Sequence, residues 1–274
     1  MQQQTLAKPA AYAGVGLHSG KEVEITLHPA PVDTGIVFVR TDLEERTEIP
    51  AVAANVTSTL RATTLSMRDV RIFTVEHLMS ALHGFGIDNC RIEINAEEPP
   101  VADGSSIVFL DLLKNAGRVQ QDKERREIRI DKVYRIDDGE RFVMAVPYDG
   151  LRVSFTSLNE RKLIGVQYHD FILTEDVYRK DIAPARTIAY EKEVDALRAA
   201  GLGLGGTLEN VIVYNDEGWL NTLRFEDELV RHKILDLLGD VRLAGAVKGH
   251  FIAVKSGHEL NTRLAKAIYA DWLR

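Results

Sequence analysis

The stretch VRHKILDLLGD, residues 230–240, shows the pattern on which the predicted fold is built. Its apolar stripe recurs at spacings of three and four residues: Ile234, Leu237, Leu238 and Val241. Such spacing places side chains on one face of a helix, so residues 225–245 are predicted to form an amphipathic helix. The patterns that follow predict a strand over KGHFIAVKSG (248–257) and a second helix over ELNTRLAKAIYADWL (259–273).

The first half of the chain shows the same succession. TVEHLMSALHGFG (74–86) has apolar residues at helical spacing, and Thr74 is the expected N-cap because its hydroxyl can accept from a free helical amide. A strand over IDNCRIEI (87–94) and a helix over IVFLDLLKNAG (107–117) follow. Helix, strand and helix therefore occur twice in this order, each time after a group of strands.

Alternating apolar and polar runs precede both units and predict strands, among them KEVEITLHP (21–29) and LRVSFTS (151–157). The repeated order predicts an α+β fold of two similar layered domains, residues 1–122 and 123–274. Helices that cover one face of each antiparallel sheet would pack against each other, which makes a two-domain sandwich with a cleft at the junction. The single cysteine, Cys90, alternates with polar neighbours and is predicted to point into the core.

Two segments interrupt the common plan, and each is interpreted as an insertion at a domain edge. The first spans about 57–72 and the second about 190–220. The second contains GLGLGG (201–206), which matches the GxGxxG pattern of dinucleotide-binding loops. That pattern needs a strand before it and a helix after it, whereas here a helical stretch precedes and a β-rich stretch follows, so a dinucleotide site is rejected. A glycine-rich apolar turn is better suited to lie against an apolar ligand.

Composition excludes several classes of function. The formal net charge of −7 argues against nucleic-acid binding, which needs clustered Lys and Arg. No run approaches the ~18 consecutive apolar residues of a membrane-spanning helix, and the N-terminus MQQQTLAKPAAYAG lacks the features of a signal peptide. We therefore expect a cytoplasmic protein without stable membrane insertion. With one cysteine the chain cannot build a cysteine-rich zinc site, so any metal must be held by His, Asp and Glu.

His232 and Asp236 lie one helical turn apart, away from the apolar stripe of their helix. Taken alone, this pair has two interpretations: a solvated polar face, or two ligands that reach one metal ion. His77 lies off the stripe of its own helix and could supply a third ligand, which leaves room for water in a catalytic site. Glu76, next to His77, is placed to take a proton from that water.

Two further histidines are candidates for the cleft. His258, in SGHELN, is at the start of the last helix, where a proton donor and a solvent-exposed capping residue are equally compatible with the sequence. His18, in the turn GVGLHSG, is a candidate substrate contact, although a loop histidine without a role is the commoner case. Spacing alone does not decide between these alternatives.

Seven motifs, taken in order, resemble those of the UDP-3-O-acyl-N-acetylglucosamine deacetylase family, the zinc amidases of lipid A biosynthesis: GVGLHSG, TVEHLMSAL, PPVADGSS, ARTI, GLGLGG, RHKILDLLGD and SGHELN. The resemblance runs from about residue 5 to the last helix. It implies a two-domain α+β sandwich with one insertion per domain and the active site at the domain junction. It also implies hydrolysis of the acetamide of UDP-3-O-(3-hydroxyacyl)-N-acetylglucosamine to acetate and the free amine.

The resemblance further implies a role for each matching residue. His77, His232 and Asp236 would bind Zn²⁺, although this ligand set also accepts Fe²⁺. Glu76 would be the general base. The remaining catalytic residues would be His258 as cation or general acid, Asp240 orienting it, Thr187 at the oxyanion, and Lys233 in the substrate pocket.

Substrate contacts are expected at His18, at Gly203 in the glycine-rich turn, and at Phe155, a candidate for stacking on uracil. The second insertion would form an apolar passage for the acyl chain. The expected partner is therefore a small amphiphilic UDP-sugar, and the protein is expected to act as a monomer.

Two other functions are compatible with the same motifs. A different metal-dependent amidase would use these residues on another N-acyl sugar, and a substrate panel separates the two. A non-catalytic protein that binds a nucleotide sugar or a lipid would be expected to lack part of the catalytic set. All of that set is present: Glu76, His77, His232, Asp236 and His258.

Overall fold

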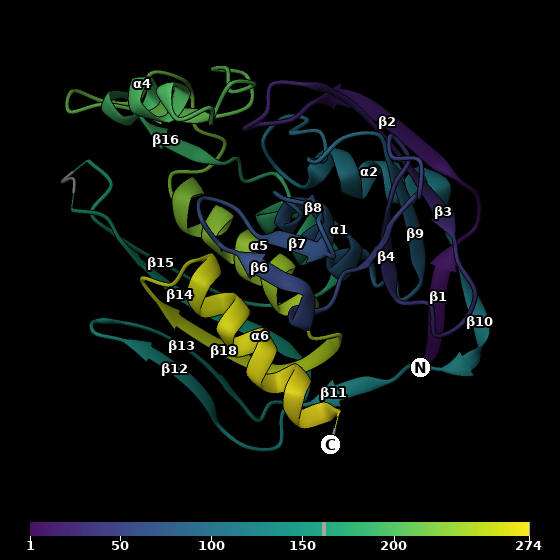
Figure 1. Ribbon diagram of the computed structural model, residues 1–274. Helices are drawn as coiled ribbons and strands as arrows, with labels where there is room; N and C mark the ends of the chain where they lie inside the picture. The colour runs from purple at the N-terminus through teal and green to yellow at the C-terminus, as the bar shows by residue number, and fades with distance from the viewer. Residues whose placement is uncertain (161–162, 274) are drawn as a thin grey trace.

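The computed structural model describes residues 1–160 and 163–273 and places helices between two main sheets (Figure 1). The first sheet comes from the N-terminal half of the chain. Its strands lie in the order β2 (Ala10–Val15), β3 (Glu22–Pro29), β9 (Cys90–Ile94), β4 (Ile36–Arg40) and β5 (Glu48–Pro50).

The second sheet comes from the C-terminal half. Its strands lie in the order β12 (Tyr134–Asp138), β13 (Arg141–Val146), β18 (Ala246–Val254), β14 (Leu151–Leu158) and β15 (Val166–Ile172). A short strand, β11 (Glu127–Arg129), pairs with the start of β18. The strands β1 (Gln2–Leu6) and β10 (Arg118–Glu124) pair with each other outside both sheets.

The two sheets share one strand order and one set of strand directions. In each, the strand that arrives after a helix enters between the second and third strands: β9 is antiparallel to β3 and parallel to β4, and β18 is antiparallel to β13 and parallel to β14. Both sheets are thus mixed, where antiparallel sheets were expected. A parallel partner needs a crossover connection, and the helix before each late strand supplies it. The repeated plan is confirmed.

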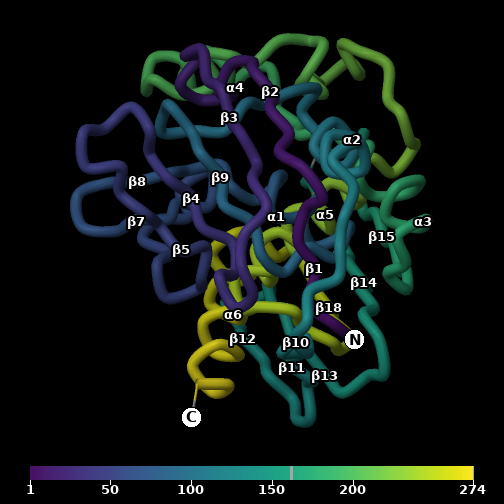
Figure 2. Tube along the Cα trace, turned by 90° about the vertical axis from the view of Figure 1, so that its right-hand side faces the viewer, coloured from purple at the N-terminus to yellow at the C-terminus, as the bar shows by residue number. Residues whose placement is uncertain are grey.

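Four helices fill the space between the sheets: α1 (Glu76–Phe85), α2 (Ile107–Ala116), α5 (Glu228–Arg242) and α6 (His258–Trp272). Figures 1 and 2 show α1 and α5 side by side at the centre of the molecule. A Cβ atom on Gly239 of α5 would overlap the backbone carbonyl of Glu76, so the glycine in RHKILDLLGD permits this close approach. The helix pair brings the two histidine-bearing segments together.

The insertions leave the common plan at equivalent points, between the fourth strand and the first helix of each half. The first follows a 3₁₀ turn (Ala53–Asn55) and forms the small sheet β6 (Val56–Ser58), β7 (Thr64–Met67) and β8 (Val70–Ile72). The second follows α3 (Glu175–Val177) and a π-helical turn (Tyr178–Ile182), and contains β16 (Ile188–Tyr190), α4 (Glu191–Ala199) and β17 (Ile212–Tyr214). The domain division at residue 122 stays a prediction.

Alternation along the strands sets which side chains enter the core. Cys90, Ile92 and Ile94 of β9 are all fully buried, as predicted, because a strand turns every second side chain to the same face. The largest apolar cluster joins both sheets to the helices between them. In residues 1–160 and 163–273, no helix has the length and apolar character needed to cross a membrane.

Candidate metal centre and catalytic cavity

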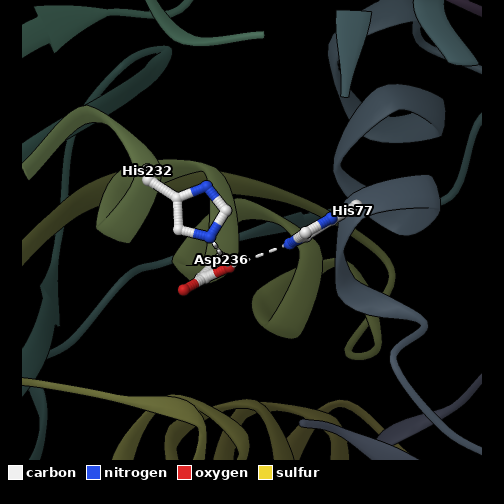
Figure 3. Close-up of side chains that lie close together, drawn as sticks. All are labelled: His77, His232 and Asp236. Carbon is white, nitrogen blue, oxygen red and sulfur yellow. Dashed lines mark ion pairs between the residues drawn. The ribbon is translucent and has the colours of Figure 1, made fainter. Parts of the chain in front are cut away.

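Two histidines and an aspartate from the facing helices α1 and α5 converge on one point (Figure 3). His77 is in the first turn of α1, and His232 and Asp236 are one turn apart on α5. Asp236 Oδ1 lies 3.8 Å from His77 Nε2 and 3.4 Å from His232 Nε2. One ligand-capable atom from each residue lies within 4.8 Å of the other two. The three side chains form a compact, buried donor set.

The donor set fits a divalent cation. Within the described part of the chain, Asp236 Oδ1 is buried without a hydrogen bond, an arrangement that is unfavourable unless a cation or proton satisfies the oxygen. His232 Nδ1 lies 3.0 Å from the carbonyl oxygen of Ala185. Because a carbonyl only accepts, Nδ1 carries the hydrogen, and the lone pair of Nε2 faces Asp236.

Electrostatics favour the protonation states that metal binding needs. Burial, with His232 nearby, lowers the pKa of His77 to about 3, and burial also lowers the pKa of His232. Burial alone would raise the pKa of Asp236, but His232 and Lys233 outweigh it and hold that pKa well below its usual range. Near neutral pH the site therefore offers two neutral imidazoles and one carboxylate. Three such ligands are typical of a catalytic metal site that keeps a position open.

A second buried network adjoins the metal cluster. Glu76, the first residue of α1, has Oε1 3.7 Å from His258 Nε2. Asp240 Oδ2 lies 3.0 Å from His258 Nδ1 and accepts a hydrogen bond from Asn261 Nδ2 at 2.9 Å. A carboxylate only accepts, so His258 Nδ1 carries a hydrogen. The imidazole of His258 is thus held between two carboxylates.

The network contains both a proton acceptor, Glu76, and a proton donor, His258. Burial raises the pKa of Glu76 to about 8, although His258 opposes this shift. Burial alone would lower the pKa of His258, but the carboxylates of Asp240 and Glu76 outweigh it and raise that pKa to about 10. The site can therefore hold a carboxyl group that exchanges a proton near neutral pH beside an imidazolium that can donate one.

A cavity of about 830 Å³ opens beside both networks, and Glu76, His258 and the three metal-cluster residues line it. The predicted residues Thr187, Lys233, His18 and Gly203 line it as well. Lys233 Nζ lies 3.1 Å from Asp236 Oδ2. The cavity extends along the second insertion over apolar side chains: Ile188, Val194, Leu197, Leu208, Val211, Val213 and Leu220.

The glycine-rich turn of the second insertion docks on the turn that carries His18. The backbone amides of Leu204 and Gly205 donate to the carbonyls of His18 and Leu17 at 3.2 and 3.0 Å, and Gly203 N–H donates to His18 Nδ1 at 3.3 Å. A Cβ atom on Gly205 would overlap the carbonyl oxygen of Gly16. GLGLGG therefore serves backbone-to-backbone packing that closes one wall of the cavity.

Two predicted site residues do not line the cavity: Asp240, which lies behind His258 and contacts its ring, and Phe155, which is remote from the site chemistry. Phe155 is only 1% exposed and belongs to the main apolar cluster, so its ring cannot stack on a ligand in this structure. On β14, Val153 and Phe155 occupy alternate positions that both point toward the helices, and both are fully packed. The uracil-stacking assignment is therefore wrong.

Glu98 is a residue that the sequence analysis missed. Its buried carboxylate accepts from the amides of His18 and Ser19 at 3.0 and 2.9 Å and from the Thr74 hydroxyl at 2.8 Å. The prediction that Thr74 caps α1 is therefore wrong. Its hydroxyl bonds to Glu98, and its positive φ of 56° turns the residue away from the helix. The only local signal was a carboxylate in the loop EEPPVADGSS, and its partners lie up to 80 residues away.

Known proteins resemble this chain over nearly its whole length. A family model described as UDP-3-O-acyl N-acetylglycosamine deacetylase matches residues 3–270. The UDP-3-O-acyl-N-acetylglucosamine deacetylase of Syntrophotalea carbinolica is 44% identical over 272 residues, covering 98% of this chain and 88% of the relative. The proteins of that name from Hahella chejuensis and Pseudomonas entomophila are each 44% identical, over 276 and 278 residues, covering 99% of this chain and 91% of each relative. The chain belongs to the UDP-3-O-acyl N-acetylglycosamine deacetylase family.

Proposed function

We propose that this protein is a metal-dependent hydrolase that removes the N-acetyl group of UDP-3-O-(3-hydroxyacyl)-N-acetylglucosamine, the deacetylation step of lipid A biosynthesis. The observation that carries the proposal is the convergence of the His77–His232–Asp236 cluster with Glu76 and His258 on one cavity. The substrate is inferred from the activity after which the three relatives are named. The products are acetate and the free amine of the UDP-sugar.

Zinc is the proposed metal, held by His77, His232 and Asp236. Two imidazoles and a carboxylate suit this borderline-soft cation, and they also accept Fe²⁺. When bound, the ion would lower the pKa of water and polarise the acetamide carbonyl. Every other part of the proposed chemistry belongs to side chains of the protein.

Glu76 and His258 move the protons. Glu76 accepts a proton from the attacking water as the oxygen bonds to the acetamide carbon, and its raised pKa of about 8 suits a group that takes up and later releases a proton near neutral pH. His258 donates its Nε2 proton to the amine nitrogen as the carbon–nitrogen bond breaks. Asp240 holds the imidazole in this orientation through Nδ1.

The remaining cavity residues orient the substrate. Thr187 is proposed to donate its hydroxyl hydrogen to the oxygen of the tetrahedral anion, a contribution of about 3–4 kcal/mol where such donors have been removed from other enzymes. Lys233, His18 and Gly203 are proposed to contact the sugar and the chain attached to it. The apolar extension of the cavity under the second insertion is proposed to accept the acyl chain, because apolar side chains line it.

His258→Gln is expected to lower kcat/KM about 100-fold near pH 7, the size of a general-acid contribution. The pKa of His258 is raised to about 10, so the wild-type imidazolium is present at neutral pH and is lost as pH rises through about 10. The substitution should therefore also abolish the decline of activity at high pH. Profiles of kcat/KM from about pH 6 to about pH 11 measure both effects.

His250→Gln is the matched control, because His250 lies on β18 away from the cavity. It should leave the rate within about twofold of wild type and the alkaline decline in place. An alkaline decline that survives in His258→Gln would show that another group donates the proton.

The proposed function is tested by acetate release from UDP-3-O-(3-hydroxyacyl)-N-acetylglucosamine. Three preparations are compared: protein as isolated, chelator-stripped protein, and stripped protein with Zn²⁺ restored. Activity should disappear with the metal and return with it. Folded, metal-loaded protein that releases no acetate from this substrate but does so from another N-acyl sugar would support the broader amidase function, and tight binding without release would support a binding protein.

Cellular placement and assembly complete the proposal. We propose that the protein works as a monomer in the cytoplasm and meets its amphiphilic substrate there. Sedimentation of the purified protein, with and without substrate, tests the monomeric state, and fractionation of cells tests the compartment.

A further inference from the structure

Thr63 of the first insertion contacts both carboxylates that flank His258. Its hydroxyl donates to Asp240 Oδ1 at 2.6 Å, and its backbone amide donates to Glu76 Oε2 at 3.1 Å. The side chain is fully buried. Thr63 therefore acts as a hydrogen-bond donor to both carboxylates.

These bonds close a ring around His258. The imidazole contacts Glu76 Oε1 through Nε2 and Asp240 Oδ2 through Nδ1, while Thr63 takes the second oxygen of each carboxylate. Thr63 thereby determines which oxygen of each carboxylate faces the imidazole. Asn261 and His258 both contact Oδ2 of Asp240, whereas Thr63 donates to Oδ1. Without the Thr63 hydroxyl, Oδ1 would be buried without this donor.

The chain segment that leads into Thr63 is fastened to the second half of the molecule at two points. Lys266 Nζ of α6 donates to the carbonyl of Val56 at 2.9 Å, and the amide of Ala53 donates to the carbonyl of Leu243, just after α5, at 2.8 Å. Glu76 belongs to the first half, whereas Asp240 and His258 belong to the second. Thr63 therefore lies where the two halves must be aligned for proton transfer.

We propose that Thr63 is a positioning residue for the deacetylation: through Asp240 and Glu76 it fixes the geometry of His258 relative to the general base. This inference rests on the proposed function and extends it to the first insertion. Thr63 need not touch the substrate, since it does not line the cavity. Its loss should slow the chemical step and leave substrate binding nearly unchanged.

Thr63→Val removes the hydroxyl with little change of shape and keeps the backbone amide. We expect kcat to fall about 10- to 100-fold, the range seen when outer hydrogen-bond partners of other active sites are removed, with KM within about twofold of wild type. Thr63→Ser, which keeps the hydroxyl, should recover most of the rate. Thr64→Val makes the same chemical change at the next residue and should leave kcat and KM unchanged.

Metal content and thermal unfolding of each variant separate positioning from damage to the fold. Wild-type activity in the same assay tests the proposed function on its own, so an inactive wild type would count against that function and not against Thr63 in particular. In an Asp240→Ala background, Thr63→Val should add less than a twofold effect, because the partner of the hydroxyl is already absent.

Three outcomes would overturn the proposal. The first is wild-type kcat in folded, metal-loaded Thr63→Val. The second is a rise in KM that accounts for the whole loss of kcat/KM, which would place Thr63 in substrate binding. The third is a full, independent effect of Thr63→Val in the Asp240→Ala background.

Discussion

His232→Ala is expected to bind no stoichiometric metal and to release acetate no faster than the uncatalysed background. His232 Nε2 and Asp236 Oδ1 lie one helical turn apart at 3.4 Å, and His77 approaches the same oxygen from the facing helix. Removing one of three ligands leaves two donors, too few to hold a catalytic ion against water. Metal analysis after gel filtration, together with the acetate assay, measures the two effects.

The fold should survive this substitution better than the activity does. His250→Ala, a change of the same type on β18, is the control and should retain both metal and rate. If His232→Ala keeps one tightly bound ion per chain and a wild-type rate, the metal is held by other ligands. The assignment of His77, His232 and Asp236 as the metal site would then be wrong.

Glu76→Gln is expected to retain the metal and to lose about 10²- to 10⁴-fold in kcat, about 3–5 kcal/mol of transition-state stabilisation. The amide has nearly the shape of the carboxyl group but cannot accept the proton of the attacking water. Because the negative charge of Glu76 helps to raise the pKa of His258, its removal should lower that pKa. The residual activity should therefore decline at a lower pH than in wild type.

The measurements for Glu76→Gln are kcat across the pH range and metal content at neutral pH. Glu97→Gln is the control, since Glu97 forms an exposed ion pair with Arg71 at 3.0 Å. A loss of less than tenfold in Glu76→Gln, with metal in place, would assign the base to another residue.

Local pattern alone predicted much of the fold. Apolar spacing located the helices around 74–86 and 225–245, and the doubled order of elements predicted two layered α+β units of one plan. It did not predict the parallel pairs β4–β9 and β14–β18, because strand direction depends on where a crossover returns to the sheet. The prediction of Thr74 as an N-cap was wrong, because its hydroxyl donates a hydrogen bond to Glu98, which is distant in the sequence.

Part of the candidate site could be predicted from the sequence. The i,i+4 spacing of His232 and Asp236 places both on one face of α5, whatever surrounds that helix. Residue type and position also made His77, Glu76, His258 and His18 candidates, and the resemblance to a family then added Thr187, Lys233, Asp240 and Gly203. All of these residues are in or beside the cavity, whereas Phe155 is buried in the core. The prediction for Phe155 was wrong because alternating apolar residues are also typical of a strand in the core. Only the packing of the folded chain shows that the face of β14 that carries Phe155 is covered.

By itself the sequence determined which side chains share a helix face, which strands alternate, and which residue types are available to hold a metal. These properties depend on neighbours within a few positions. Only the tertiary structure decided that His77 meets α5, that Glu98 anchors two distant turns, and that Thr63 joins Glu76 to Asp240. The raised pKa values of Glu76 and His258 likewise come from burial and from charges that only folding brings together, because electrostatic fields act through space and not along the chain.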